Sequence, residues 1–297
     1  MGKYIVANFT DVSFLPKQDV EATVRYALTN SIGLDCLYPI DLFSIIESWG
    51  VDVVTKFSSE PYLAKILLTQ CPKIIINTQK SIDEIRAEIL INSTLRFSIA
   101  HELGHYFLNK LNNEEIKTRF NKTNSNKQIN TFNAVTEYQA NEFAAALLIP
   151  EHSFKNYQNH NGKPLEMAKS ISNDYRVSLT TAFLRMAKLS ENITVCLHID
   201  TQAGKIKHLA HSKLWDDIRY EHKPYWALKI SKKSDIPEYS ATNKVLTNPT
   251  SNNAGIRNNM PIDMWFEEYT GENTLNEWVY PFADRLITYI EVDIPDY

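Results

Sequence analysis

The chain has 297 residues, 43% of them hydrophobic and 22% charged, which are the proportions of a globular protein with room for two domains of ordinary size. Its net charge of -4 argues against strong nonspecific binding of nucleic acid by the whole chain, although it leaves a local basic patch open. The three cysteines are an odd number and widely spaced, which argues against both a disulfide framework and a zinc knuckle.

The expected location follows from the absence of long apolar runs. No such run near Met1 is long enough for a signal peptide, and no stretch approaches the length of a membrane span. We therefore expect a cytoplasmic protein that makes no contact with a membrane. In that reducing compartment the cysteines are expected to be small, buried apolar side chains; they are Cys36, Cys71 and Cys196.

The first elements expected along the chain are helices and short strands. An apolar stripe predicts a helix over 19–30, and a second helix is expected over 39–49, with Pro39 in its first turn and Gly50 after its end. The segments that follow are a strand over 51–54, a segment over 64–69 that fits a strand or a helix, a strand over 73–77 and a helix over 83–91.

The most informative segment is the run from His101 to His105, which lies in an apolar, helix-compatible stretch over 95–108. Two histidines four residues apart project from one face of a helix, about 6 Å apart along its axis, so both imidazoles can reach one metal ion. Glu102 lies beside the first histidine, where it can take a proton from a water held by such an ion. This pattern is typical of a zinc hydrolase, most often a metallopeptidase.

The alternative is a surface helix that carries two solvated histidines. The apolar flanks argue against it, because burying two histidines and a charged Glu102 without partners would cost roughly several kcal/mol. A divalent cation removes that cost. Gly104 weakens the helix by about 1 kcal/mol relative to alanine, yet it leaves room for another element to approach between the two histidines.

A third ligand is expected, because a catalytic zinc usually takes three protein ligands and leaves a fourth position to water. An alanine- and leucine-rich segment that ends at a proline predicts a second buried helix, with Thr136 as its N-cap. Glu137 and Asn141 share one face of it; Glu137 fits the third ligand and Asn141 fits a residue that orients a ligand histidine. Glu142 competes for the ligand role, but it points about 100° away and is interpreted as an exposed carboxylate.

Two motifs in this order resemble the ImmA/IrrE family of metallo-endopeptidases. They span 96–106 and 137–150, and the segment 73–77 resembles the strand and asparagine that precede the motif helix in that family. The resemblance covers residues 38–190. The polar stretch over 112–130 departs from the family pattern and is expected to be a flexible insertion at the rim of the active site.

The resemblance implies a site and a substrate. The metal would be zinc, held by His101, His105 and Glu137, with Glu102 as the general base. Members typically cleave a helix-turn-helix repressor, often in mobile elements or stress responses. In this fold class a small sheet lies over the motif helix, and we expect an extended peptide substrate to add to its edge strand.

A helix, a short turn and a second helix are predicted over 164–189, the pattern of a helix-turn-helix unit. Thr180, Thr181 and Arg185 would then contact DNA. The alternative is that the segment packs under the peptidase domain and contacts no nucleic acid. We favour this alternative, because Arg185 and Lys188 are the only cations of the second helix.

The pattern changes after residue 192. Segments over 193–200 and 205–209 predict a hairpin that turns at Gly204, and a further strand is expected over 285–292. The tryptophans of this region are expected in a core rather than a ligand cage; they are Trp215, Trp226, Trp265 and Trp278. Its histidines lack metal-binding spacing; they are His198, His208, His211 and His222.

Together these patterns predict an α+β protein of three parts. A mostly helical, zincin-like peptidase domain with a small sheet occupies 1–150, a helix-turn-helix-like segment occupies 151–192, and an α+β domain, GAF-like by family analogy, occupies 193–297. The last part is expected to sense a ligand or bind a partner, and either it or the insertion would control cleavage.

The favoured function is an intracellular zinc endopeptidase that cleaves a helix-turn-helix repressor. The alternative is a non-catalytic regulator that binds a repressor or an antitoxin-like partner, with zinc structural or absent. Direct DNA binding through 163–190 is the third and weakest hypothesis. The residue that stabilises the oxyanion is left open among Tyr106, Tyr138 and His152.

Overall fold

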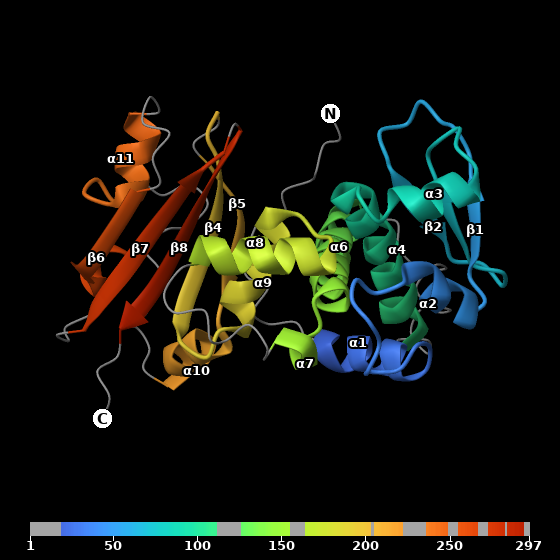
Figure 1. Ribbon diagram of the computed structural model, residues 1–297, viewed down its shortest axis with the longest axis horizontal. Helices are drawn as coiled ribbons and strands as arrows, with labels where there is room; N and C mark the ends of the chain where they lie inside the picture. Colours follow the sequence, from blue (N-terminus) through green and yellow to red (C-terminus); the bar gives the residue numbers. More distant parts are fainter. Residues whose placement is uncertain are drawn as a thin grey trace. The chain divides into compact units, whose positions relative to one another are not determined.

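The computed structural model describes residues 19–111, 126–154, 164–202, 205–221, 236–248, 255–266, 273–282 and 284–293. The chain divides into two compact units, the first formed by 1–156 with 171–178 and the second by 157–170 with 179–297. Each unit combines helices with one sheet, which confirms the α+β class (Figure 1). The helices of the predicted segment 151–192 are divided between the two units.

The sheet of the first unit has three short strands in the order β1-β3-β2. They are β1 (Asp52–Thr55), β2 (Ala64–Leu67) and β3 (Lys73–Ile76). β1 pairs parallel with β3, whereas β2 pairs antiparallel with β3 and forms one edge of the sheet. The segment over 64–69, which the sequence left open, is therefore a strand at its start, and that strand packs against the motif helix.

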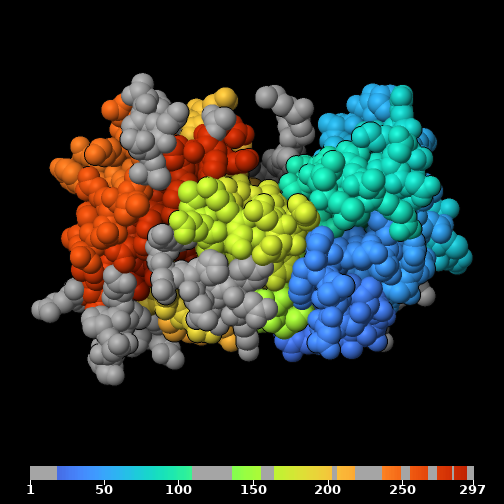
Figure 2. Space-filling view, in the orientation of Figure 1, coloured from blue at the N-terminus to red at the C-terminus, as the bar shows by residue number. Residues whose placement is uncertain are grey.

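The helices of the first unit pack around the pair that carries the site. In chain order they are α1 (Val20–Thr29), α2 (Leu42–Ser48), α3 (Ile82–Glu88), α4 (Ser93–Leu111), α6 (Asn126–Leu148) and α7 (Glu151–Phe154). α4 and α6 are in contact along their apolar faces, where Phe107 and Phe143 stack with ring centroids 5.5 Å apart. In the space-filling view, the blue residues of α1 and α2 and the teal residues around α3 form part of the surface of this unit (Figure 2).

Two helix starts differ from the prediction. α2 begins at Leu42 rather than at Pro39, because the Asp41 side chain accepts hydrogen bonds from the amides of Phe43 and Ser44 and so caps the helix there. Thr136 is not an N-cap, because α6 already begins at Asn126. The segment before Thr136 contains no glycine or proline to interrupt a helix. Residues 126–130 of the predicted insertion are thus helical, and 112–125 lie outside the described residues.

The second unit is built on an antiparallel sheet of five strands in the order β5-β4-β8-β7-β6. They are β4 (Ile193–Asp200), β5 (Lys205–His211), β6 (Gly255–Pro261), β7 (Thr274–Pro281) and β8 (Arg285–Asp293). The predicted hairpin and the predicted strand over 285–292 are confirmed, and Gly204 lies outside the described residues.

Helices cover both faces of this sheet. They are α8 (Pro164–Tyr175), shared with the first unit, α9 (Leu179–Leu189), α10 (Lys213–Glu221), α11 (Ala241–Thr247) and the 3-10 turn η3 (Ile262–Met264). α9 packs on β4, β5 and β8, with Phe183 stacked on Tyr280. Trp215 and Trp265 are buried in the core on the other face, as expected, whereas Trp278 is half-buried and Trp226 lies outside the described residues.

The cysteines do not share one environment. Cys196 is buried in β4, Cys36 is half-buried and Cys71 is exposed between β2 and β3, and all three are free thiols. The expectation of three buried cysteines is confirmed for Cys196, met only in part by Cys36, and wrong for Cys71, because the β2–β3 connection lies at the surface. Within the described ranges, every helix is too short or too polar to cross a membrane.

Candidate metal centre

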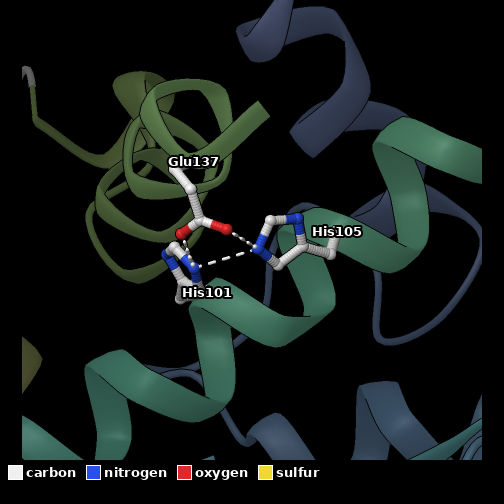
Figure 3. Close-up of side chains that lie close together, drawn as sticks. All are labelled: His101, His105 and Glu137. Carbon is white, nitrogen blue, oxygen red and sulfur yellow. Dashed lines mark hydrogen bonds and ion pairs between the residues drawn. The ribbon is translucent and has the colours of Figure 1, made fainter. Parts of the chain in front are cut away.

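Three side chains from two helices converge on one point, as Figure 3 shows. His101 and His105 lie on α4, and Glu137 lies on α6. The Nε2 atoms of the two histidines are 3.1 Å apart, and each is 3.2 Å from a different carboxylate oxygen of Glu137. Among the described residues, these three form the cluster of ligand atoms that fits a metal ion, and Glu142 is not part of it.

Gly104 permits the close approach of α4 and α6 that brings Glu137 to the histidines. A Cβ at this position would lie 3.0 Å from both the Cα and the carbonyl oxygen of Ala140 and 3.2 Å from the Cβ of Phe143. Ala140 is three residues, or one turn, after Glu137. The expectation that Gly104 leaves room for another element is confirmed, and that element is the helix that carries Glu137.

Asn141 holds the ring of His101 from the side opposite to the cluster. The Nδ1 of His101 lies 2.9 Å from the Oδ1 of Asn141, which accepts its proton. Because Asn141 accepts the hydrogen bond from the Nδ1 proton, Nε2, on the side of His105 and Glu137, is the ring atom that can bind a metal ion. The structure therefore places Asn141 where the sequence predicts an orienting residue.

The charges of the cluster depend on one another. Hydrogen bonds from His101 and His105 hold the pKa of Glu137 far below its ordinary value. Burial acts to lower the pKa of His101, but Glu137, Glu102 and Asn141 together raise it above its ordinary value. Two imidazole nitrogens and one carboxylate are the donor set that zinc takes when a further position is left open, so these residues fit that ion.

Glu102 points to the edge of the small sheet. Its Oε2 accepts a hydrogen bond of 2.8 Å from the backbone N–H of Ile66 in β2. Burial raises the pKa of Glu102, while His101, His105 and the Ile66 N–H oppose that rise. Sequence reasoning missed Ile66, because only the pairing of β2 on β3 determines which of its amides face outward.

The three residues proposed for the oxyanion have different surroundings. Tyr106 is only 8% exposed, and its hydroxyl donates to the carbonyl oxygen of Trp49 at 3.4 Å. His152 lies on α7, beyond the end of α6, with Nε2 2.9 Å from the carbonyl oxygen of Leu34. Tyr138, beside Glu137, is 38% exposed and stays a prediction for this role.

The helix-turn-helix-like segment forms two helices, α8 and α9, as predicted. Arg185 of α9 is only 2% exposed, so it is not placed for the contact with DNA that the disfavoured helix-turn-helix hypothesis gave it. The amphipathic face of α9 turns this side chain towards the interior, which a count of cations cannot show. Thr180 and Thr181 are half-buried, and no contact with DNA has been tested for them. The histidines His198 and His208 stack with ring centroids 5.3 Å apart, and His222 lies outside the described residues.

Comparison with known proteins agrees with this site. The sequence model of one family, described as the IrrE N-terminal-like domain (Peptidase_M78), matches residues 64–186. No significant match was found among curated proteins. Among solved structures, a Mycobacterium tuberculosis transcriptional regulator is similar with a TM-score of 0.57 and 12% identity, over 93% of this chain and 77% of that one, which shows a shared fold alone. Residues 64–186, which include the three converging side chains and Glu102, are thus similar to the IrrE N-terminal-like domain, in agreement with the ImmA/IrrE resemblance of the sequence motifs.

Proposed function

We propose that this protein is a zinc-dependent endopeptidase, with the zincin-like site that the sequence motif predicts. The observation that carries the proposal is the convergence of His101, His105 and Glu137 beside Glu102, at the contact of α4 with the edge strand β2. The Peptidase_M78 match over these residues supports it, because that family is metallopeptidase-like.

The residues of the chain have separate tasks in this chemistry. Zinc, when bound by His101, His105 and Glu137, supplies a Lewis acid and an acidified water. Glu102, held by the Ile66 N–H, takes the proton of the attacking water and later gives it to the leaving amine. Its pKa, raised by burial, suits a carboxylate that must both accept and release a proton.

Substrate would enter as an added strand on β2. β2 is an edge strand, and the Ile66 N–H faces away from β3 towards Glu102. An extended peptide that pairs with this edge would run along α4 and place one of its carbonyl groups near Glu102. Glu102 already occupies the Ile66 N–H, so the peptide would bond to the other outward-facing main-chain groups of β2, which leaves selectivity to the side chains.

The substrate that we propose is a helix-turn-helix repressor in the cytoplasm. The support is the resemblance to the ImmA/IrrE family, whose members typically cleave such repressors. We further propose that the second unit, GAF-like by analogy, controls cleavage by binding a ligand or a partner. Removal of residues 193–297 with unchanged regulation would contradict that assignment.

The decisive experiment compares Glu102→Gln with Glu142→Gln, which makes the same change on α6 outside the cluster. Each purified protein is loaded with zinc, its metal content is measured, and it is incubated with purified helix-turn-helix repressors, beginning with any that is encoded beside its gene. We expect one zinc per chain in both proteins. Cleavage should fall by about 100- to 10,000-fold in Glu102→Gln only, because that variant lacks the proton acceptor.

The opposite results would support the non-catalytic alternative. A fully active Glu102→Gln protein would contradict the mechanism. A chain that takes up no stoichiometric zinc, and whose function survives His101→Ala, would instead be a regulator that acts by binding its partner.

A further inference from the structure

The connection between β1 and β2 has to pass the central strand of the small sheet. β3 lies between these two strands, and β1 runs parallel to it, so the C-terminal ends of β1 and β3 lie at the same edge. Asn77 directly follows β3 at that edge. The loop over 56–63 therefore crosses the chain where Asn77 stands.

The Asn77 side chain makes three hydrogen bonds to this loop. Its Oδ1 accepts a hydrogen bond of 2.7 Å from the N–H of Ser58, and its Nδ2 donates to the carbonyl oxygens of Glu60 and Tyr62, each at 3.0 Å. Its own backbone N–H donates to the carbonyl oxygen of Leu63 at 2.8 Å. Both donor hydrogens of the amide and one of the two lone pairs of its oxygen are therefore used to hold the loop.

The last of these bonds is made by Leu63, one residue before β2 begins. They can therefore fix the position of β2, whose own residues specify its register on β3 only weakly. The strand has only four residues; Ala64 and Ile66 share one face and Lys65 and Leu67 the other, and only Ala64 is buried. The hydrophobic pattern that specifies the register of a strand is therefore short in β2. The first pair of the observed register joins Ala64 to Ile76, directly beside the clamped loop.

The register of β2 on β3 determines which backbone group Glu102 contacts. Successive amides of a strand point to opposite sides in the plane of the sheet, so a slip of one residue would turn the Ile66 N–H from Glu102 towards β3. Glu102 would lose its hydrogen bond, and the free edge would present a different set of amides to a peptide.

We infer that Asn77 is the positioning residue that locks the register of β2, and so orients both Glu102 and the edge on which substrate adds. The effect on catalysis rests on the proposed function; the effect on β2 does not. Asn77 lies on neither helix that carries the metal-binding cluster, so its loss should leave zinc binding intact.

The test uses the full chain with Asn77→Asp, which keeps the shape and the Ser58 bond but places a carboxylate against the carbonyls of Glu60 and Tyr62. The matched control is Asn30→Asp, the same change at an exposed amide whose Nδ2 donates to the carbonyl oxygen of Tyr26 at 2.8 Å. Zinc stoichiometry, amide hydrogen exchange over 63–67, and kcat and KM on fluorescein-labelled casein are measured for both.

We expect Asn77→Asp to bind zinc as the unsubstituted protein does. The Ile66 amide should exchange at least about tenfold faster, and kcat/KM should fall at least about tenfold, with a rise in KM. Asn30→Asp should change neither. Unchanged exchange and kcat/KM in Asn77→Asp would overturn the inference, and so would losses that only parallel a loss of zinc.

Two further arms keep the test decisive. If Asn77→Asp does not fold, Asn77→Ser removes the two donated bonds without adding charge and carries the same expectations. If the unsubstituted protein cleaves neither casein nor a helix-turn-helix repressor, the proposed function loses support, while faster exchange at Ile66 in the variant still supports the register lock and unchanged exchange still overturns it.

Discussion

Glu277 in the second unit and Glu137 in the first are both carboxylates among packed helices and strands, but their partners differ in kind. The side chain of Glu277 is fully buried, and it accepts hydrogen bonds from the amides of Ala241 and Thr242 and from the Thr242 hydroxyl, at 2.6–2.9 Å. Glu137 is half exposed and meets two imidazole nitrogens that are themselves only 3.1 Å apart.

The difference separates a structural carboxylate from a ligand. The donors around Glu277 are amides and a hydroxyl that always carry their protons, so the group is satisfied by the protein alone. The nitrogens around Glu137 are donors only when protonated, and at 3.1 Å two of them compete for the same protons. A divalent cation resolves that competition, because both lone pairs and the carboxylate can bind it together. Substitutions at these groups and at the residues around them test this difference between the two carboxylates.

Glu137→Gln should have the largest effect. Zinc affinity is expected to fall by more than about 100-fold, because even residues that only orient a metal ligand contribute 10–100-fold. The measurement is a competition titration with a chromogenic chelator, with Glu142→Gln as the matched control. Unchanged affinity in Glu137→Gln, with a loss in the control, would make Glu142 the ligand.

Glu277→Gln should act on stability and leave zinc binding unchanged. The substituted side chain would present an NH₂ group to the backbone amides and the Thr242 hydroxyl that donate to the Glu277 carboxylate. This loss of an acceptor is expected to lower the free energy of unfolding by about 3 kcal/mol. Chemical denaturation followed by tryptophan fluorescence measures it, since Trp215 and Trp265 report on that core. A fall in zinc affinity would show that the contrast between the two carboxylates is wrong.

Gly104→Ala should lower both the stability of the protein and its affinity for zinc. The added methyl group has to displace the backbone of Ala140, so we expect a loss of about 2 kcal/mol in stability and weaker zinc binding as Glu137 moves away. Thermal unfolding with and without zinc measures this. A variant that is more stable and binds zinc normally would show that α6 can shift without moving the ligand.

Asn141→Ala should weaken zinc binding by about tenfold with little change in stability. It removes the acceptor that holds the Nδ1 proton of His101, so the ring is free to rotate and to change tautomer. Asn141→Asp, which keeps an acceptor, should restore the affinity. Equal losses in the two variants would assign the effect to packing rather than to the hydrogen bond.

The smallest effect is expected from pH on the second unit. Burial, with His208, Arg285 and Lys207, lowers the pKa of His198 to about 4 from its ordinary 6.5. Between these values the unfolded chain binds more protons than the folded one, so the free energy of unfolding falls as pH drops from 6.5 towards 4. The side chains are partly exposed, so we expect a change on the order of 1 kcal/mol.

His198→Gln should flatten that pH dependence of stability. Denaturation at pH 7 and pH 5 measures the slope in both proteins. An equal slope in the variant and the unsubstituted protein would assign the dependence to other groups.

Much of the local structure could be predicted. The apolar stripe over 19–30 predicts α1, and Asp19 indeed caps it. Where the prediction is wrong, the position of a helix start or the burial of a side chain depends on another local signal or on a contact with a distant part of the chain. α2 begins after Asp41 because the Asp41 side chain caps it there. α6 begins before Thr136 because the preceding segment contains no residue that interrupts a helix. Arg185 looked available for DNA because its burial depends on elements that follow it in the chain.

The local geometry of His101, Glu102 and His105 can be predicted from their spacing, because side chains four residues apart lie on one face of a helix. The same argument places Glu137 and Asn141 on one face of a second helix. In contrast, the contact of these helices at Gly104, and that of the Ile66 amide, in the register that we assign to Asn77, with Glu102, depend on the tertiary structure. Those contacts join residues far apart in the chain, and packing and hydrogen bonding in three dimensions select them rather than any local period.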